Sequence, residues 1–324
     1  MSVKIFSEQD FPAYLPKLNA LYDDLFSGGK GFRSQLIQII SKPLGVPKEV
    51  ENLLSQTIEF IHNASLLHDD LIDRSQLRRG KPAAWAKYTP EYAVLAGDYL
   101  LARVMVNLSG HGNIKLVQFT SQTISDLLEG EWLQDSVVGD FFISVTQLDR
   151  IHNLKTGSLF KWCLKAPFKA LEKYDKDLHI ILDEMGTLLG QLFQRSYDLL
   201  DYDIRNDEGK VILGDLKSGY LNSFGAYVSN NMNRAAIDKM VKSKTMDDFY
   251  LVFSDDRIQG KEQFLKFVNH FDSENIQKIR LYDHYVDQLN VKLNEMNLNQ
   301  IDIKNLITTL KSLTDLLYFR KRPA

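Results

Sequence analysis

Hydrophobic residues recur at helical spacing along most of this chain. In one early segment they stand at Leu53, Leu54, Ile58 and Ile61, close to the i, i+3, i+4, i+7 pattern of a helix with one buried face. Pro47 stands near the start of this run, where proline suits the first turn of a helix. No stretch shows the sustained alternation of apolar and polar residues that marks β-hairpins. The pattern therefore predicts an all-α protein.

Comparable runs continue to the C-terminus. We expect helices over residues 92–108, 115–135, 147–164, 178–202, 221–240, 262–271, 275–295 and 303–319. No internal repeat, low-complexity tract or Gly/Ser-rich linker divides them, so we expect one large helical-bundle domain over residues 1–324. Thr156 and Gly157 weaken a helix by roughly 1 kcal/mol relative to alanine, which predicts a break there. Residues 202–219 are polar and glycine-punctuated, which predicts a mobile loop.

The composition narrows the class of protein. The chain has 324 residues, a formal net charge of −3 and a single cysteine, Cys163, so we expect neither general affinity for nucleic acid nor an intrachain disulfide. The N-terminal residues lack the apolar core of a signal peptide, and no uninterrupted apolar run reaches the ~18 residues of a membrane span. We therefore expect a cytoplasmic protein without an integral membrane segment.

The strongest candidate for chemistry is the segment HNASLLHDDLIDRSQLRRGKP. It carries three carboxylates (Asp69, Asp70 and Asp73) and then two adjacent arginines (Arg78 and Arg79). Residues four apart share a helix face, so Asp69 and Asp73 repel each other unless a cation lies between them. Mg²⁺ prefers such oxygen ligands and shares them with substrate phosphates, while arginine forks bind phosphate oxygens. A DDxxD pattern alone is common on solvated helix faces, but the arginines favour a magnesium and phosphate site.

Other polar residues extend this acidic face along the same helix. His62, Ser65, Asp69 and Asp73 follow spacings of three, four and four residues, and so form one stripe on an otherwise apolar segment. Such a stripe is either solvated surface or the wall of a site, and the surrounding residues are too apolar for a mostly solvated surface. A histidine satisfied within the core is the alternative for His62, but its alignment with Asp69 favours a site residue.

A second acidic face lies near residue 200. Gln194, Asp198 and Asp201 are spaced four and three residues apart, which again places them on one helix face. Two acidic helices that face each other across a bundle can hold several Mg²⁺ ions between them. The alternative is a salt-bridged helix end that uses the nearby Arg195 and Arg205.

Basic residues complete the candidates. The loop SGGKGFR contains Lys30 and Arg33 and precedes a predicted helix, whose N-terminus favours anions, although a plain surface loop is the alternative. It is not a Walker loop, because Gly31 follows the lysine where serine or threonine is required. Lys155 precedes the predicted helix break, and Lys210 lies in the polar loop.

Together these motifs closely resemble those of the trans-isoprenyl diphosphate synthases, also called polyprenyl synthetases. The resemblance extends from about residue 28 to about residue 219, in the family's order, through GGKGFR, HNASLLHDDLIDRSQLRRGKPA, AGDYLL, LLEGEWLQ, LKTGSLF and GQLFQ. It implies an isoprenoid synthase-like helical bundle around a central cavity, usually a homodimer. It also implies a magnesium-dependent prenyltransferase, which condenses isopentenyl diphosphate with an allylic prenyl diphosphate and releases pyrophosphate.

The resemblance assigns a role to each candidate residue. Two or three Mg²⁺ ions would be held by a set of carboxylates, Asp69, Asp73, Asp198 and Asp201, with Asp70 in support. The allylic diphosphate would be bound by three basic residues, Arg78, Lys155 and Lys210. Isopentenyl diphosphate would be bound by a second set, Lys30, Arg33, His62 and Arg79. The developing carbocation would pass Thr156 and Gln194, which complete an implied catalytic set with Lys155, Asp69 and Asp73.

Two small residues bear on the length of the product. Ser65 and Ala64 lie four and five residues before Asp69, which is roughly 6–7.5 Å along a helix. Neither side chain would block the tail of a growing prenyl chain, and small residues at these positions resemble the longer-chain members of the family. We therefore expect a product longer than farnesyl diphosphate, a medium- or long-chain polyprenyl diphosphate.

The sequence departs from the family pattern at several positions. Tyr197 replaces the first aspartate of the second acidic motif, Tyr220 replaces a diphosphate-binding lysine, and Asn222 replaces a threonine. In the first basic motif, Gly31 stands for arginine and Ser34 for proline. These changes leave two alternatives to an active synthase. One is a catalytically impaired homologue that acts as a subunit of a heteromeric synthase, and the other is a terpene synthase-like enzyme that ionises a prenyl diphosphate without condensing it.

Overall fold

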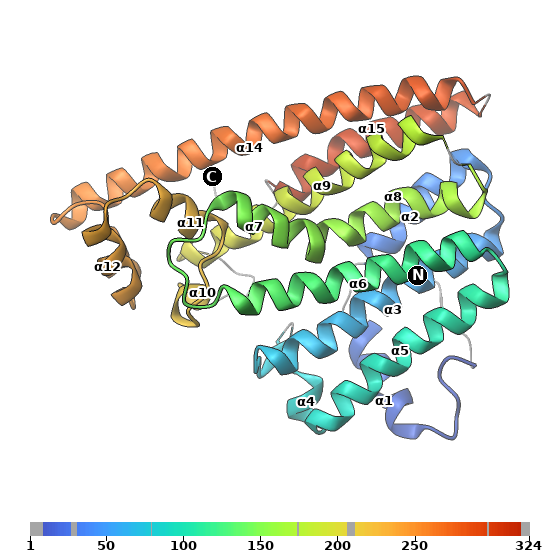
Figure 1. The fold of residues 1–324 in the computed structure, drawn as a ribbon, viewed down its shortest axis with the longest axis horizontal. Helices are drawn as coiled ribbons and strands as arrows, with labels where there is room; N and C mark the ends of the chain where they lie inside the picture. Colours follow the sequence, from blue (N-terminus) through green and yellow to red (C-terminus); the bar gives the residue numbers. More distant parts are fainter. Residues whose placement is uncertain are drawn as a thin grey trace. The chain divides into compact units, whose positions relative to one another are not determined.

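The structure is a computed structural model that describes residues 9–26, 31–78, 80–173, 175–205, 211–296 and 298–318. Within these residues it is almost entirely helical, which confirms the all-α prediction (Figure 1). The α-helices are α1 (Pro16–Phe26), α2 (Phe32–Leu44), α3 (Lys48–Ile72), α4 (Ala84–Lys87), α5 (Pro90–His111), α6 (Ile114–Ser136), α7 (Val145–His152), α8 (Ser158–Ala170), α9 (Lys176–Leu199), α10 (Gly214–Lys217), α11 (Ser223–Asn230), α12 (Arg234–Lys242), α13 (Met246–Tyr250), α14 (Arg257–Asn294) and α15 (Gln300–Tyr318).

Three short elements complete the description. The strands β1 (Leu77–Arg78) and β2 (Lys81–Pro82) form an antiparallel hairpin. The π-helical turn η1 (Asn153–Gly157) and the 3₁₀ turn η2 (Leu200–Tyr202) adjoin longer helices. None of the helices in the described part of the chain combines the length and the apolar character needed to cross a membrane.

Two expected helices have different boundaries. Pro47 is the N-cap of α3 rather than a residue of its first turn. The run expected over residues 221–240 is two helices, α11 and α12. The side-chain oxygens of Asn222 and Asn233 each accept a backbone N–H, which starts a separate helix at each position.

A third difference concerns the C-terminal half of the chain. The runs expected over residues 262–271 and 275–295 are one continuous helix, α14. The gap between the two expected runs consists of Asp272, Ser273 and Glu274, three polar residues. Just after them, Asn275 is fully buried, and its side-chain amide donates to the carbonyl oxygen of Phe271 in the same helix. A short polar stretch therefore interrupted the hydrophobic pattern without interrupting the helix.

The chain forms two compact units. Unit 1 comprises residues 1–125, 159–183 and 293–306. Unit 2 comprises residues 126–158, 184–292 and 307–324. Helices α6 and α9 contribute residues to both units. The expectation of a single domain over residues 1–324 stays a prediction.

Unit 1 is built around α3, which packs against α2 and along α5 (Figure 1). Leu54, Ile58 and Ile61, which the apolar pattern placed on the core face, have at most 1% of their surface exposed. The ring of His68 lies directly over Gly97 of α5, where a Cβ atom would come 2.2 Å from Nε2 of the imidazole. This contact lets the two helices approach closely and fixes the end of α3 that carries the acidic segment.

Unit 2 contains an aromatic core. Its members Tyr202, Phe224, Phe249, Phe264 and Phe271 are all buried. Their rings meet edge-on or tilted, with centroids 4.9–6.1 Å apart, which is the geometry that aromatic quadrupoles favour. This core lies beside the residues that follow the second acidic face, because Tyr202 belongs to η2.

A close crossing of α9 with η1 lies in the same unit. The helix break expected near Thr156 is confirmed, because α7 ends at His152, η1 follows, and α8 begins at Ser158. A Cβ atom on Gly190 of α9 would lie 2.5 Å from Cα and 2.6 Å from N of Gly157. Both are backbone atoms that cannot turn aside as a side-chain tip can. Glycine at this crossing therefore lets η1 lie directly against α9.

Replacing Gly190 with alanine is expected to destabilise the protein, because the new methyl group collides with the backbone of η1. Overpacking of this kind costs about 1–3 kcal/mol. Gly110 of α5 is the matched control, since a Cβ atom there meets nothing within 4 Å and alanine favours the helix by about 1 kcal/mol. Urea unfolding gives the stability of both variants. A denaturation midpoint for Gly190→Ala at or above that of the unmodified protein would show that the added methyl group does not collide with η1.

Candidate active site

The first acidic segment lies at the C-terminal end of α3 in unit 1. Asp69 and Asp70 belong to the last turn, and Asp73 is the C-cap, whose N–H donates to the carbonyl oxygen of Asp69 at 2.8 Å. Asp70 is buried, Asp69 is half-buried and Asp73 is exposed. The predicted placement of Asp69 and Asp73 on one helix is confirmed, and these two carboxylates are the accessible pair.

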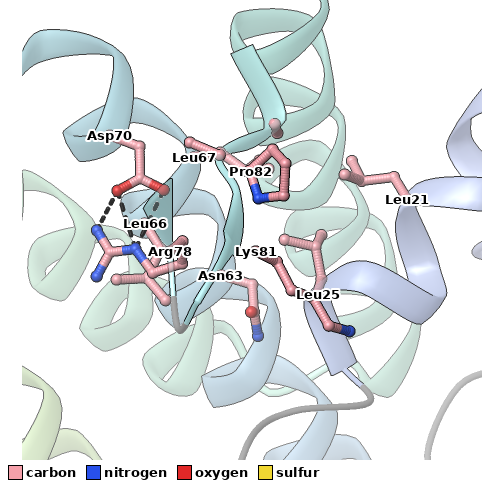
Figure 2. A pocket seen from close by; sticks show the side chains of 11 residues that line it. Leu21, Leu25, Asn63, Leu66, Leu67, Asp70, Arg78, Lys81 and Pro82 are labelled. Carbon is pink, nitrogen blue, oxygen red and sulfur yellow. Dashed lines mark hydrogen bonds and ion pairs between the residues drawn. The ribbon is translucent and has the colours of Figure 1, made fainter. Parts of the chain in front are cut away.

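Asp70 and Arg78 form a bidentate ion pair. Nε of Arg78 donates to Oδ1 of Asp70 at 2.9 Å and to Oδ2 at 3.1 Å, and its Nη2 also contacts Oδ1 (Figure 2). Arg78 lies in β1, and Gly80 at the turn of the hairpin has a φ of 75°, a left-handed conformation that glycine adopts without strain. The pair therefore ties the arginine hairpin to α3, a task that the sequence alone did not assign to Asp70.

A cavity of about 150 Å³ lies under the hairpin, between α1, α3 and β2. Leu21, Leu25 and Leu67 form part of its apolar wall, while Asn63 and Lys81 are polar residues of its lining (Figure 2). The lining residues of α3 follow the spacing i, i+3, i+4, i+7 from Asn63 to Asp70, a different face from the stripe of Asp69 and Asp73. The cavity and the accessible carboxylates thus occupy neighbouring faces of one helix.

The rest of the polar stripe lies further back along α3. His62 and Ser65 are both half-buried, and the Ser65 hydroxyl donates to the carbonyl oxygen of His62 at 2.9 Å. Ala64 has no exposed surface. In α2, the guanidinium of Arg33 lies 5.8 Å from the ring centroid of Phe160, a cation–π contact.

Three predicted basic residues lie outside the described residues: Lys30, Arg79 and Lys210. Their roles stay predictions.

Unit 2 holds the other predicted residues, beginning with Lys155 in η1. The ammonium group of Lys155 forms an ion pair with Glu131 and donates to Oε1 of Gln134 at 3.2 Å. Both partners come from α6, within the segment LLEGEWLQ. The sequence alone predicts no role for Glu131 and Gln134, because a carboxylate and an amide on an amphipathic helix are ordinary surface residues.

A chain of hydrogen bonds joins η1 to the second acidic face. Thr156 Oγ1 donates to Oε1 of Gln194 at 3.4 Å, and Nε2 of Gln194 donates to Oδ1 of Asp198 at 2.8 Å. The other carboxylate oxygen of Asp198 accepts from the backbone N–H and the hydroxyl of Ser223, at 2.9 and 2.6 Å. The structure thus brings together Thr156, Gln194 and Asp198, three residues that the sequence had placed in one site.

Asp201 is also turned inward, toward the loop that precedes α11. It is fully buried, and its Oδ1 accepts backbone N–H groups of Gly214 and Asp215 at 3.0 and 3.4 Å. Burial, together with the nearby charges of Asp201, Asp215 and Asp198, raises the pKa of the Tyr202 phenol well above its ordinary value. The carboxylates of this face therefore organise the polar segment between η2 and α11.

The arginines near the second face do not pair with Asp198. Arg195 is buried and binds both oxygens of Asp149 at 2.9 and 3.0 Å, and also contacts Asn275 at 3.1 Å. Arg205 donates to Asp203 at 3.2 Å. The ion pair of Arg195 joins α9 to Asp149 rather than to the second acidic face, and Asp198 accepts hydrogen bonds from Gln194 and Ser223 instead.

His152 is a buried residue next to this network that sequence reasoning missed. It ends α7, immediately before η1. Burial lowers the pKa of its imidazole below the usual range, although the nearby carboxylates of Asp198 and Asp149 oppose this shift. A lone histidine within a predicted helix gives no signal in a single sequence, so the sequence assigned this position no role.

The positions that depart from the family pattern differ in exposure. Tyr197, which stands where an aspartate was expected, has 37% of its surface exposed. Tyr220 is half-buried, and Asn222 is fully buried, where it caps α11 and donates to Oδ2 of Asp215 at 2.9 Å. Asn222 therefore has a structural role that its side-chain amide suits.

The carboxylates fit Mg²⁺ to different degrees. Asp69 and Asp73 share an accessible face, and their hard oxygens suit an ion that keeps water and phosphate ligands. Both oxygens of Asp198 already accept hydrogen bonds. In the described part of the chain, no three carboxylate, imidazole or thiol groups lie close enough together to enclose a metal ion.

Comparisons with known proteins define the class. The model of the polyprenyl synthetase family matches residues 15–251, well over half of the chain. A solved structure of a decaprenyl diphosphate synthase from Rhodobacter capsulatus superposes with a TM-score of 0.80 at 23% identity, over 96% of this chain and 92% of that one, which shows a shared fold. The chain belongs to the polyprenyl synthetase family.

Two relatives of known name are similar in sequence. Octaprenyl diphosphate synthase of Escherichia coli (strain K12) is 32% identical over 193 residues, which is 59% of this chain and 59% of that protein. Decaprenyl-diphosphate synthase of Dictyostelium discoideum is 34% identical over 233 residues, 71% of this chain and 49% of that protein. The aligned part of the chain thus spans about half to three fifths of each relative.

Replacing Asp70 with asparagine is expected to loosen the hairpin, because Arg78 loses a charged partner that is itself buried. Hydrogen bonds to charged groups contribute about 1.5–3 kcal/mol. Arg78 is 39% exposed, so solvent screening reduces the expected loss to about 1–2 kcal/mol. Asp98→Asn is the control, since Asp98 is 64% exposed. Urea unfolding that places Asp70→Asn within error of Asp98→Asn would show that the pair does not hold the hairpin.

Proposed function

We propose that this protein is a magnesium-dependent trans-prenyltransferase that condenses isopentenyl diphosphate with an allylic prenyl diphosphate. The observation that carries the proposal is the end of α3, where Asp69 and Asp73 share an accessible face and Asp70 fixes Arg78 at the same end of the helix. The names of the two relatives, octaprenyl and decaprenyl diphosphate synthase, support a medium- or long-chain polyprenyl product.

The proposed reaction exchanges one bond for another. The C–O bond of the allylic diphosphate breaks, and its electron pair leaves with pyrophosphate. The double bond of isopentenyl diphosphate then forms the new C–C bond, and a proton is lost to the released pyrophosphate. Arg78 and Lys155 would neutralise the charge that grows on the leaving group. The oxygens of Thr156 and Gln194 would present weakly basic dipoles to the carbocation.

Magnesium would complete this site. Held by Asp69 and Asp73, it would supply the positive charge that lets pyrophosphate leave. We retain Asp198 and Asp201 as proposed ligands of a further ion. Because both oxygens of Asp198 already accept hydrogen bonds within unit 2, Asp198 would bind an ion only after exchanging some of those donors.

We also propose a homodimer located in the cytoplasm. Two apolar side chains on one face of α6 support the dimer, because Leu128 is 51% and Trp132 is 76% exposed, and they stand four residues apart. The single cysteine, Cys163, supports a reducing compartment, because it is buried and has no second cysteine to pair with.

A specific observation favours a second candidate, an impaired subunit of a heteromeric synthase. Tyr197 occupies the position of an expected carboxylate and projects toward solvent, while Asp198 is fully engaged by Gln194 and Ser223. The second metal-binding half would then be weak in this chain, and a partner subunit would supply the missing ligands.

Elongation of labelled isopentenyl diphosphate tests the proposal. Purified protein with Mg²⁺ and allylic primers of several lengths is expected to form extractable products longer than farnesyl diphosphate, because the metal and phosphate ligands of α3 are present. Chelation with EDTA is expected to abolish the reaction, and Asp69→Asn to reduce it by at least about 10²-fold, in the range of lost charge stabilisation.

Each other outcome points elsewhere. Inactivity that a co-expressed partner chain restores would support the heteromeric subunit. Hydrocarbon or alcohol formed without isopentenyl diphosphate would support a terpene synthase-like enzyme. Full activity in EDTA would refute the metal-dependent reaction.

Product length is expected to fall when Ser65 is replaced with phenylalanine. Ser65 is half-buried on the stripe of Asp69, one turn further back, so a ring there would stop the growing chain. Ala64→Phe is the less informative variant, because Ala64 has no exposed surface and a large side chain would overpack the core. Leu66→Phe is the control, since Leu66 lines the cavity under the hairpin on another face. Chromatography measures the chain lengths of the products. Identical product distributions for Ser65→Phe and the unmodified protein would show that Ser65 does not line the path of the growing chain.

A further inference from the structure

Lys155 is seated by one short segment of α6, residues 130–134. Its ammonium group contacts the Glu131 carboxylate and donates to Oε1 of Gln134 at 3.2 Å. The lysine side chain is 20% exposed and that of Glu131 is 14% exposed, so the pair is largely withdrawn from water. An ion pair at this depth is less screened by salt and solvent than a surface pair.

The backbone of the same segment is shaped to admit the lysine. A Cβ atom on Gly130 would lie 2.7 Å from Cγ of Lys155, 3.0 Å from Cβ of Leu154 and 3.0 Å from the backbone N of Lys155. Any side chain at position 130 would therefore displace both the stem and the backbone of Lys155. Glycine removes the obstacle, glutamate supplies the charge and glutamine supplies a second acceptor, all to a single ammonium group.

The geometry leaves the ammonium group with bonding capacity. A lysine ammonium has three N–H donors. Among the described residues, Oε1 of Gln134 accepts one of these donors, and the Glu131 carboxylate forms an ion pair with the same ammonium group. These two contacts hold a flexible four-carbon stem in one conformation, so the remaining donor capacity has a defined direction in which to meet an anionic ligand.

The turn that carries Lys155 is also held from the other side. Gly157 is pressed against Gly190 of α9, and Thr156 bonds to Gln194. A π-helical turn is an uncommon conformation that occurs often at functional sites. The backbone is thus fixed by α9 and the side chain is fixed by α6, which is more support than an exposed structural ion pair requires.

We propose that Glu131 and Gln134 are positioning residues that hold the Lys155 ammonium ready to bind the diphosphate of the allylic substrate. This inference rests on the proposed prenyltransferase function and names the groups that pre-organise one of its substrate contacts. Without Glu131 the lysine stem gains freedom, and this freedom must be lost again whenever the diphosphate binds.

Steady-state kinetics with both substrates varied tests the inference. Glu131→Gln is expected to raise the KM for the allylic diphosphate about tenfold and to change the KM for isopentenyl diphosphate less than about twofold. Gln134→Leu is expected to raise the allylic KM about threefold, because it removes a neutral acceptor rather than a charge. Glu131→Asp, which keeps the charge on a shorter stem, is expected to fall between Glu131→Gln and the unmodified protein.

Two controls separate positioning from general damage. Glu129→Gln removes a neighbouring carboxylate of α6 that is 52% exposed and pairs with Arg150, and it is expected to leave both KM values unchanged. In a Lys155→Ala background, Glu131→Gln is expected to have no further effect on the allylic KM, because its target is already absent. Thermal unfolding of each variant confirms that the protein remains folded.

Calorimetric binding of inorganic pyrophosphate with Mg²⁺ provides a readout that does not need turnover. Weaker pyrophosphate binding by Glu131→Gln than by Glu129→Gln supports the positioning role of Glu131. Equal binding by the two variants, or a lower allylic KM in Glu131→Gln, overturns it, because Glu131 would then be a spectator or a competitor for Lys155. Elongation by the unmodified protein is measured separately. If the enzyme is active and the variants bind the allylic diphosphate as well as the unmodified protein does, only the positioning role of Glu131 and Gln134 is refuted. A chain that neither elongates nor binds pyrophosphate refutes both proposals.

Discussion

The second acidic segment depends on the hydrogen bonds that the buried carboxylate of Asp198 accepts. A carboxylate removed from water is stable only where hydrogen-bond donors replace the water. Gln194 supplies one donor and Ser223 supplies two. Gln194 also accepts from Thr156 of η1, and Ser223 begins α11. One buried charge thus fixes three segments of unit 2 to one another, and a substitution at any of them is transmitted to the others.

The two acidic segments use their carboxylates in opposite ways. At the end of α3, Asp70 forms an ion pair with Arg78, while Asp69 and Asp73 remain accessible. At the end of α9, Asp198 and Asp201 are both buried and accept donors from their own unit. The difference follows from the elements that come next. A two-strand hairpin covers only one face of α3, whereas α10 and α11 supply backbone N–H groups to the carboxylates that precede them.

Helical periodicity was sufficient for most of the fold, because α3 and its neighbours bury one continuous apolar face. It failed where a polar residue serves the structure. The polar residues 272–274 divide the apolar pattern of α14 without ending the helix, and Asn222 and Asn233 start helices within a run that looked continuous. The break near Thr156 was predictable, since poor helix formers stood in an otherwise strong pattern. Its close approach to Gly190 was not, because Gly190 lies 33 positions from Gly157 in the chain.

The candidate site shows the same limit. Residue spacing was enough to group Asp69 with Asp73 and Gln194 with Asp198, because those pairs lie within one helix or its cap. Pairings between elements carried no signal: the hairpin that brings Arg78 back to Asp70 has strands of two residues, too short for alternation. The partners of Lys155 lie on α6, where nothing in the sequence distinguishes Glu131 from the exposed Glu129.

Tyr197 affects the capacity of the second acidic segment to bind a metal ion. A phenol is a weaker ligand for Mg²⁺ than a carboxylate, and this one is 37% exposed at a position where the family pattern has an acid. Asp198 cannot replace it without giving up Gln194 or Ser223, and either loss would loosen the contact with η1 or with α11.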